Sequence, residues 1–589
     1  MKKIYILILA TAFLTGCDDL FSPAIEDHKS IETGHEDPVF AVGILGNAYT
    51  RNPYNSQSFN DVATDDAVTN QTGDSFLKMA TGGWTSANNN MEQWGTCKMA
   101  IQYLNLFLEQ VGSVSFADDE RINKMFIDRH RGEALGLRAM NMFYLIQAHG
   151  GWTANGELLG VPNITASENV DSDFNRPRDT FEDCVKQIYN DVEMALSLLP
   201  LDYEDITSDM EIPQRYKIDG VNVSEYNRVF GKQMRTRMSG RIAMAFRAKA
   251  ALLAASPAFA QGTTVTWEDA AIYNGELLDM IGGISGLDPK GNTWYKNKDE
   301  IDNLGAGENP KEMLWRNGKS TSDYGLEQNQ FPPSLYGRGQ VNPTQNLVDA
   351  FPMANGYPIT MNESNYDANN PYVNRDPRLN LYIVVNGSTM GHNNAVINTA
   401  TDNTDNDDGL NKENGYSTRT GYYLRKHLRE DVYLSSTTQN GQPHYSPRIR
   451  YTEIFLNYAE AANEAWGPTG SGEYDFSAYD VIKAIRQRAG VGADNGDAYL
   501  ESIKNDQAKM RELIRNERRL ELCFEGFRFW DMRRWKLNLN ETAKGIQITG
   551  NTYKVIDVEN RKYEPYMTYG PIPYSEILKY NALEQNQGW

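Results

Sequence analysis

Apolar residues recur every three or four positions in several stretches of the chain, which is the spacing of an amphipathic helix. In residues 179–199 the apolar positions are Phe181, Val185, Ile188, Val192, Ala195, Leu196 and Leu199. Asp179 or Thr180 supplies an N-cap and Pro200 ends the pattern, so we predict one helix here. Residues 131–149 repeat the pattern up to Gly150-Gly151 and predict a second helix.

Two further stretches each predict a pair of helices joined by a short turn. In the first, an alanine-rich helix begins at Ser239 and runs to about Ala260, and another begins at Trp267. Residues 449–466 and 477–489 predict the second pair. Each unit spans about 40 residues, near the tetratricopeptide period. None of the predicted helices is apolar all round, so each buries a stripe against its neighbour, and we predict a mostly α-helical, stacked architecture.

Long polar segments lie between these helical pairs. Residues 282–345 and 386–447 are rich in Gly, Asn, Asp, Ser, Thr and Tyr. Loops of this length inside a folded chain are usually functional or disordered. Because they alternate with the helices, we predict one domain over residues 17–589 with large loop-rich insertions, rather than separate domains.

Composition narrows the class of protein. The chain has 589 residues, of which 40% are hydrophobic and 23% charged, and this composition supports a folded core. A mean hydropathy of −0.59 excludes a multi-span membrane protein. The net charge of −21 argues against a nucleic-acid partner, because phosphate binding needs clustered Lys and Arg. The 33 Tyr and 10 Trp suggest flat rings that stack on a ligand.

Residues 1–16 have the pattern of a lipoprotein signal peptide. Lys2 and Lys3 precede an apolar run of 11 residues, Ile4 to Leu14, which is too short for a membrane span of about 20. The run leads into Leu14-Thr15-Gly16-Cys17, which resembles a bacterial lipobox, so we predict lipidation of Cys17; the alternative is an ordinary signal with a nearby cysteine. Two or three acyl chains anchor a protein stably. Asp18-Asp19 resembles the signal for outer-membrane sorting.

The other cysteines give no sign of redox or metal chemistry. Cys97, Cys184 and Cys523 are widely spaced, odd in number and without a CxxC motif. We predict that they are buried free thiols.

A search for catalytic and metal-binding motifs finds little. The seven His residues form no HExxH pattern, and no GxSxG motif occurs. Gly318-Lys319-Ser320 is a poor match to a phosphate loop because Met313 stands where its first Gly belongs. Asp402, Asp405, Asp407 and Asp408 partly match a calcium loop, but Thr404 and Gly415 occupy two ligand positions, so we favour a solvated acidic loop. We predict no cofactor, metal or catalytic residue.

Two groups of charged residues have alternative interpretations. Glu453, Glu460 and Glu464 fall on one helix face and could act as an acid–base pair of a helical glycosidase, although salt bridges to neighbouring helices are favoured. Residues 515–535 interleave Arg and acidic residues with aromatic ones. Such density favours a paired network between helices over an anion site.

Seven ordered motifs resemble the SusD/RagB family of outer-membrane nutrient-binding lipoproteins. The residues of this chain that match the seven motifs are Glu133-Ala134 to Arg138-Ala139 with Gly160-Val161-Pro162, Pro343-Thr344-Gln345 to Phe351, Arg375-Asp376-Pro377-Arg378, Arg450 to Asn463-Glu464, Ile485-Arg486 to Gly490, Glu517-Arg518-Arg519 to Arg528, and Pro571-Ile572-Pro573 with Gln585-Asn586-Gln587-Gly588-Trp589. In the last motif Gln587 replaces the usual Pro.

The resemblance implies a fold and a function. The fold is a right-handed superhelical frame of tetratricopeptide-like helix pairs, with an N-terminal part of about 17–330 and a C-terminal SusD/RagB part of about 331–589. The function is that of a surface lipoprotein of the outer membrane that binds oligosaccharide or polysaccharide and delivers it to a SusC-like TonB-dependent barrel, without catalysis. Alternatives are RagB-like binding of peptides, a helical glycosidase, or a tetratricopeptide adaptor that binds only protein.

A glycan site needs aromatic faces for the apolar side of the sugar ring, and polar side chains for its hydroxyls. Both kinds of side chain occur in the stretch before the helix near Trp94, where the family often places ligand contacts, and in the loops of residues 292–338. The predicted ligand-binding residues are Trp84, Asn88, Asn89, Trp294, Tyr295, Tyr324, Asn329, Tyr336 and Arg338.

Overall fold

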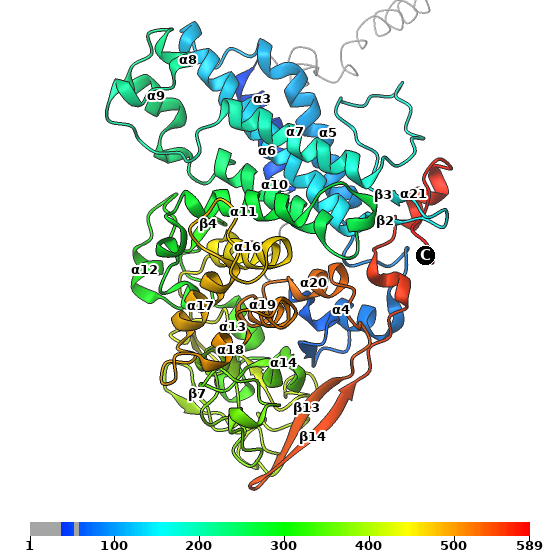
Figure 1. Cartoon of the computed structure of the whole chain (residues 1–589), viewed down its shortest axis with the longest axis vertical. Helices are drawn as coiled ribbons and strands as arrows, with labels where there is room; N and C mark the ends of the chain where they lie inside the picture. The colour runs from blue at the N-terminus through cyan, green and yellow to red at the C-terminus, as the bar shows by residue number, and fades with distance from the viewer. Residues whose placement is uncertain (1–36, 52, 54–57) are drawn as a thin grey trace, which may run out of the picture.

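Helices occupy one end of the elongated molecule and loop-rich segments the other (Figure 1). The computed structural model describes residues 37–51, 53 and 58–589. The predicted signal peptide and Cys17 lie outside the described residues. Within them, no helix is both long enough and apolar enough to cross a bilayer.

The predicted helices are confirmed with small shifts at their ends. They are α7 (Phe181–Leu198), α10 (Gly240–Ala255), α11 (Trp267–Asp279), α16 (Tyr451–Trp466) and α17 (Ala478–Ala489). The Thr180 hydroxyl caps α7 by accepting a hydrogen bond from the Asp183 N–H at 3.0 Å. The helix predicted over 131–149 is longer: α6 (Glu120–His149) begins where Asp119 caps the Arg121 and Ile122 N–H groups.

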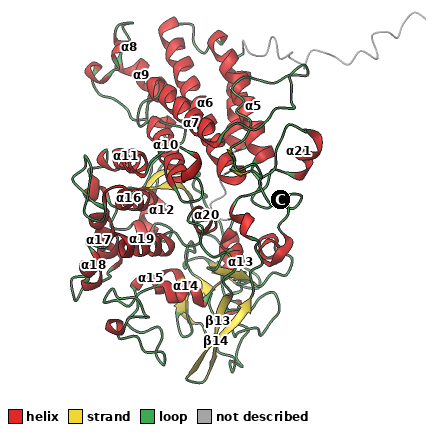
Figure 2. Ribbon diagram, turned by 45° about the vertical axis from the view of Figure 1, so that its right-hand side comes forward, coloured by secondary structure: helices red, strands yellow, loops and turns green. Residues whose placement is uncertain are grey.

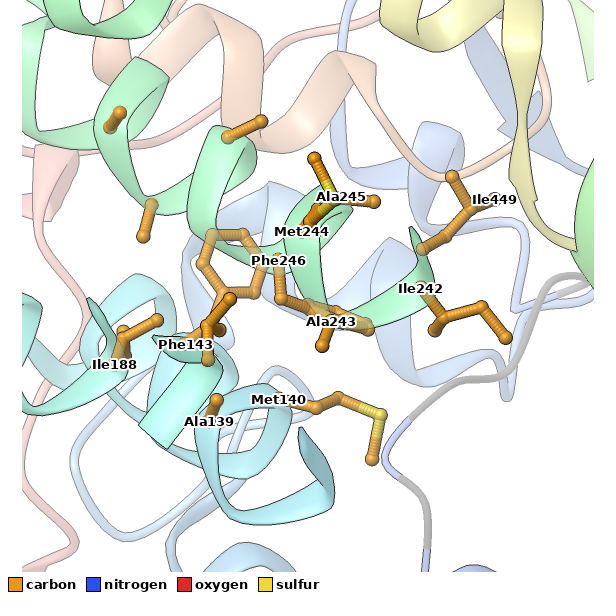
Figure 3. Close-up of a cluster of buried hydrophobic side chains, with 14 of the residues drawn as sticks. Ala139, Met140, Phe143, Ile188, Ile242, Ala243, Met244, Ala245, Phe246 and Ile449 are labelled. Carbon is orange, nitrogen blue, oxygen red and sulfur yellow. The ribbon is translucent and has the colours of Figure 1, made fainter. Parts of the chain in front are cut away.

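Consecutive helices pack on one another to form the frame. The contacts run from α3 (Pro38–Thr50) to α5 (Trp94–Gln110), then through α6, α7, α10, α11 and α16 to α19 (Gln507–Glu521). Figure 3 shows the centre of this stack, where Phe143 of α6, Ile188 of α7 and Phe246 of α10 meet. The protein is therefore mostly helical, with a tetratricopeptide-like stack.

Shorter helices connect or cover the frame. They are α4 (Ser75–Lys78), α8 (Gln214–Lys217), α9 (Val223–Phe230), α12 (Lys298–Asn303), α13 (Gly325–Gln330), α14 (Gln345–Ala350), α15 (Pro377–Tyr382), α18 (Ala498–Ile503), α20 (Arg528–Arg534) and α21 (Tyr574–Lys579).

The strands of the described residues form two-stranded antiparallel sheets, most of them in the loop-rich end (Figure 2). The pairs are β1 (Ala67–Thr69) with β5 (Val341–Pro343), β2 (Gly151–Trp152) with β3 (Leu158–Leu159), β4 (Met313–Arg316) with β12 (Pro447–Arg450), β6 (Ile383–Val384) with β9 (Tyr423–Leu424), β7 (Thr389–Met390) with β8 (Ala395–Val396), β10 (Tyr433–Leu434) with β11 (Gln439–Asn440), and β13 (Ala543–Thr549) with β14 (Thr552–Glu559).

The charged residues of the family motifs meet in a buried network between the frame and the loop-rich end. The Arg378 guanidinium, fully buried, donates to Asp376, Glu517 and Glu521. Arg486 binds Glu517 and Asp497 at 2.7 and 2.6 Å. Burial opposes ionisation of Glu517, but the two guanidinium groups hold its pKa below the ordinary value. The favoured interpretation of residues 515–535, a paired network between helices, is confirmed by these ion pairs of Glu517 and Glu521.

Two smaller predictions can be compared with the structure. Cys97, Cys184 and Cys523 are buried free thiols, as expected, and burial raises the pKa of Cys184 to about 12. In the acidic loop, the Lys412 ammonium donates to the Asn403 and Asn406 carbonyls at 2.7 and 2.6 Å. A lysine thus provides a positive charge inside the loop that resembles a calcium site.

Candidate functional site

Two distant segments of the chain enclose a cavity of about 450 Å³ in the loop-rich end, which we name the loop cavity; it lies between residues 58–74 and 323–341. β1 and β5 join these segments with Val68 opposite Asn342. Beyond the strands, the Asn70 amide donates to the Arg338 and Gly339 carbonyls at 2.9 and 2.8 Å. The two walls are therefore fixed to each other.

Polar side chains dominate the lining of the loop cavity. The polar members are Ser58, Thr69, Gln71, Asp74, Asp323, Asn329, Gln330 and Gln340. The Gln330 side-chain carbonyl accepts a hydrogen bond from the Val341 N–H at 2.9 Å, and the Gln71 amide donates one to the Gly415 carbonyl at 2.8 Å. Among the described residues, the side-chain amide of Asn329 has no hydrogen-bond partner. An open amide of this kind can both donate to and accept from a ligand hydroxyl.

One aromatic ring, Phe59, belongs to the same lining. Its backbone is left-handed, with φ of 50°, which is uncommon for a residue with a bulky side chain. The His427 ring lies edge-on to Phe59 at 6.2 Å. Non-glycine residues in this conformation are often found at functional sites.

Arginines of the Glu517–Arg528 motif anchor the first wall of the cavity, residues 58–74. Asp65 accepts two hydrogen bonds from Arg528, both at 2.8 Å, and one from Arg519 at 2.9 Å. Arg519 also reaches Asp66 at 2.7 Å. These guanidinium groups hold the pKa of the buried Asp65 below its ordinary value. Residues 65–66 are thus tied to α19 and to the start of α20.

Of the predicted ligand-binding residues, Asn329 is in the lining of the loop cavity. Tyr324 lies between two lining residues, but its ring packs against a buried cluster that includes Phe331. Tyr336 is 57% exposed, and Arg338 is also exposed beyond α13. The Arg338 N–H donates to the Gln328 carbonyl and the Gln340 N–H to the Asn329 carbonyl, so this part of the chain runs beside the cavity.

Trp294 and Tyr295 are not open to a ligand, which corrects our expectation. They are 2% and 3% exposed and belong to the core of the insertion. The Trp294 ring packs against Tyr445 at 5.6 Å, and the Tyr295 hydroxyl donates to the Leu381 carbonyl at 2.6 Å. An insertion of this size needs its own apolar core, and these two rings provide part of it.

Trp84 is also buried, at 2% exposure, and its predicted role in stacking is likewise corrected. Its ring contacts Trp589 at 4.9 Å and Phe529 at 5.8 Å. Its indole N–H donates to Asn89 at 2.9 Å, and the Asn88 amide donates to the Gly83 carbonyl at 2.9 Å. All three residues shape the turn before α5. Asn88 is exposed, and Asn89 lies in a separate hollow beside α21.

Sequence reasoning missed Phe59, Gln71, Asp74 and Gln340, which also line the cavity. The polar run Thr69-Asn70-Gln71-Thr72-Gly73 is a signal for a loop that could have suggested part of this wall. The left-handed backbone of Phe59 has no signature in a single sequence.

The three glutamates considered as catalytic are each held by a cation. Glu460 is buried and accepts from Arg534 at 2.6 and 2.7 Å and from the Trp535 indole at 2.6 Å. Glu453 pairs with Lys249 and Glu464 with Arg511. The favoured interpretation, salt bridges between helices, is confirmed.

These features define a class: a stacked-helix protein whose loop-rich end holds a polar cavity suited to binding. A model described as "SusD family" matches residues 311–589, and one described as "Starch-binding associating with outer membrane" matches residues 39–211. The chain belongs to the SusD family.

Known structures share the fold. A SusD-like protein of Bacteroides fragilis has a TM-score of 0.70 and 22% identity, and the match covers 96% of this chain and all of that one. A SusD-like carbohydrate binding protein of the same organism has a TM-score of 0.65 and 22% identity, over 94% of this chain and 99% of the other. SusD-like protein P2 of Formosa agariphila is 31% identical over 170 residues, which cover 28% of this chain and only 30% of that relative.

Proposed function

We propose that this protein binds oligosaccharides in the loop cavity without cleaving them. The observation that carries the proposal is the lining, in which amide and carboxylate side chains surround the Phe59 ring. Sugar hydroxyls donate and accept hydrogen bonds, which the open Asn329 amide complements. The apolar C–H face of a sugar can pack on an aromatic ring. The ion-paired Glu453, Glu460 and Glu464 support a role without catalysis.

We further propose that the protein is anchored to the outer membrane through lipid on Cys17 and delivers its ligand to a SusC-like TonB-dependent barrel. The lipobox-like sequence and the model description "Starch-binding associating with outer membrane" support this location. Copurification of the native, detergent-extracted protein with a large β-barrel tests the partnership. Recovery of the chain alone under mild extraction would count against it.

Binding is tested by isothermal titration calorimetry with neutral oligosaccharides, an oligouronate and short peptides. Asn329→Ala removes both ligand-facing groups of the amide, so affinity falls roughly two- to tenfold per lost hydrogen bond. Asn551→Ala, an exposed asparagine in the β13–β14 turn, is the matched control and keeps wild-type affinity. The oligouronate binds worst because Asp74 and Asp323 are the charged groups of the lining.

Each other outcome contradicts a distinct part of the proposal. Equal affinities of the two variants would remove the loop cavity as the site. Binding of peptides but of no oligosaccharide would favour the RagB-like alternative. Release of reducing ends during incubation would show that the protein is an enzyme.

A further inference from the structure

A second cavity lies between the helical frame and the C-terminal segment; it has a volume of about 490 Å³. We name it the interior cavity. Its lining comes from α6, α10 and α16, from residues 525–534, and from the N-terminal part of the chain, which includes Asn60, Phe76 and Met91. It adjoins the loop cavity at Ser58, which lines both; beyond this residue Asn60 lines the interior cavity, while Phe59 and Val62 line the loop cavity.

Aromatic rings from distant parts of the chain line the interior cavity. Phe143 and Tyr144 come from α6, and Phe527 and Trp530 from the start of α20. Tyr144, Phe527 and Trp530 are only partly buried. Helix packing therefore leaves aromatic surface uncovered inside the cavity, where a bound ring could be held between two walls.

An ion pair between facing helices also lines the interior cavity. The Lys249 ammonium of α10 lies 2.6 Å from a carboxylate oxygen of Glu453 in α16, and the Glu453 side chain is 2% exposed. The ammonium is 5.7 and 5.6 Å from the centres of the Phe143 and Phe527 rings. A charge so far removed from water is costly unless all its hydrogen-bonding positions are used.

Several polar groups around this pair are not satisfied by protein. Among the described residues, the second carboxylate oxygen of Glu453 accepts no hydrogen bond, and the Asn457 amide N–H groups donate none, although the Asn457 carbonyl accepts from Arg518 at 2.7 Å. The Tyr144 hydroxyl and the Trp530 indole N–H also have no partner within the described part of the chain. These atoms are not sealed inside the protein but border the open space of the cavity, so a ligand that enters it can pair with them.

The charges of the lining balance. Lys249, Arg518 and Arg534 face Glu453, Glu525 and Asp531, and each of the six is in an ion pair. A ligand with a net charge would therefore meet no unpaired residue of opposite charge in the lining. The geometry instead suits a neutral ring compound with hydroxyl groups, which can donate to Glu453 and accept from Lys249 and Asn457.

We propose that the interior cavity is a second binding site, independent of the loop cavity, for a small neutral cyclic polyol such as a mono- or disaccharide. The volume is within the range of about 300–1,000 Å³ that is usual for small-molecule sites. Apolar ring faces contact the aromatic walls while hydroxyls satisfy the Lys249–Glu453 pair. This inference does not depend on the proposed function of the loop cavity.

The test uses the folded mature protein and a panel of glucose, galactose, mannose, xylose and their common disaccharides. Saturation-transfer NMR and the change in intrinsic tryptophan fluorescence, to which Trp530 of the lining contributes, report binding. At least one of these sugars binds saturably to the wild type. Glu453→Gln removes a charged acceptor without changing shape, so affinity falls roughly tenfold or more.

A second variant blocks the cavity without removing the ion pair, and far-UV circular dichroism checks that both variants are folded. Leu253→Trp fills the cavity from α10 and leaves the ion pair in place, and it also abolishes binding. Glu464→Gln, on the same helix as Glu453 but outside the lining, keeps wild-type affinity. Absence of binding by every sugar of the panel, or equal binding by the wild type, Glu453→Gln and Leu253→Trp, would overturn the proposal.

Discussion

Replacing Glu460 by Gln distinguishes a structural carboxylate from a catalytic one. Its side chain is 2% exposed, and its two oxygens accept from Arg534 and from the Trp535 indole. Gln keeps the size of the side chain but removes its charge. It also places an amide N–H₂ group against donors that need an acceptor. Arg534 then keeps one anionic partner, Asp531, at 2.8 Å.

The expected loss of stability follows from the burial of the Glu460–Arg534 ion pair. Removing one partner of a buried ion pair costs about 3–5 kcal/mol, because the other charge stays uncompensated. Glu464 on the same helix is a matched control, since it pairs with Arg511 at 2.5 Å while the arginine side chain is 34% exposed. Partly exposed pairs contribute about 0–1 kcal/mol. The two Glu→Gln changes should therefore differ by at least about 2 kcal/mol.

Urea unfolding followed by far-UV circular dichroism measures this difference. We expect Glu460→Gln to shift the midpoint to clearly lower urea than Glu464→Gln. If both variants matched the wild type within about 0.5 kcal/mol, the structural role of Glu460 would be refuted. A glycosidase would behave in the opposite way, losing released reducing ends in Glu460→Gln while keeping its stability.

Two further predictions concern Trp84 and Asp61. Trp84→Ala leaves a cavity beside Trp589 and Phe529, so we expect the free energy of unfolding, measured by thermal unfolding, to fall by about 3–5 kcal/mol. Oligosaccharide affinity below the transition should not change. A fall of less than about 1 kcal/mol would contradict the packing. Burial and the neighbouring Asp66 raise the pKa of Asp61 from 3.8 to about 7. Between these two pH values the folded chain holds a proton that the unfolded chain has released. The free energy of unfolding therefore falls as the pH rises through this range. Asp61→Asn should flatten urea midpoints measured from about pH 4 to pH 7, and an unchanged slope would show that Asp61 ionises normally.

The helical frame could be predicted because its signals are local. The Thr180 cap and the apolar stripe place α7 within two residues of its observed ends. The start of α6 was missed because polar residues such as Arg129 and His130 interrupt the apolar stripe, although both are buried in the structure. The β13–β14 hairpin was also missed, since its strand pairing is not visible in helical periodicity.

The cavity was harder to predict than the frame, because its walls are joined by tertiary contacts. Asn329 was found through its polar loop, but Gln71 and Phe59 lie more than two hundred residues away in the chain. Aromatic residues in polar loops have two uses, and a single sequence does not separate them. Trp294 and Tyr295 belong to the apolar core of their insertion, whereas Trp84 packs against Trp589 and Phe529 of the C-terminal part.

The arginine–carboxylate pairs that hold the first wall of the loop cavity lie in the interior, with Asp65 and Asp66 almost fully covered. Mobile ions screen exposed charges within about 10 Å at 0.1 M ionic strength, but they reach covered pairs much less. A partly exposed ion pair such as Lys124–Asp219, with side chains 51% and 32% exposed, therefore weakens at high salt concentration. The ion pairs that join residues 65–66 to α19 and α20 do not. The shape of the loop cavity is thus insulated from the salinity of the surrounding medium.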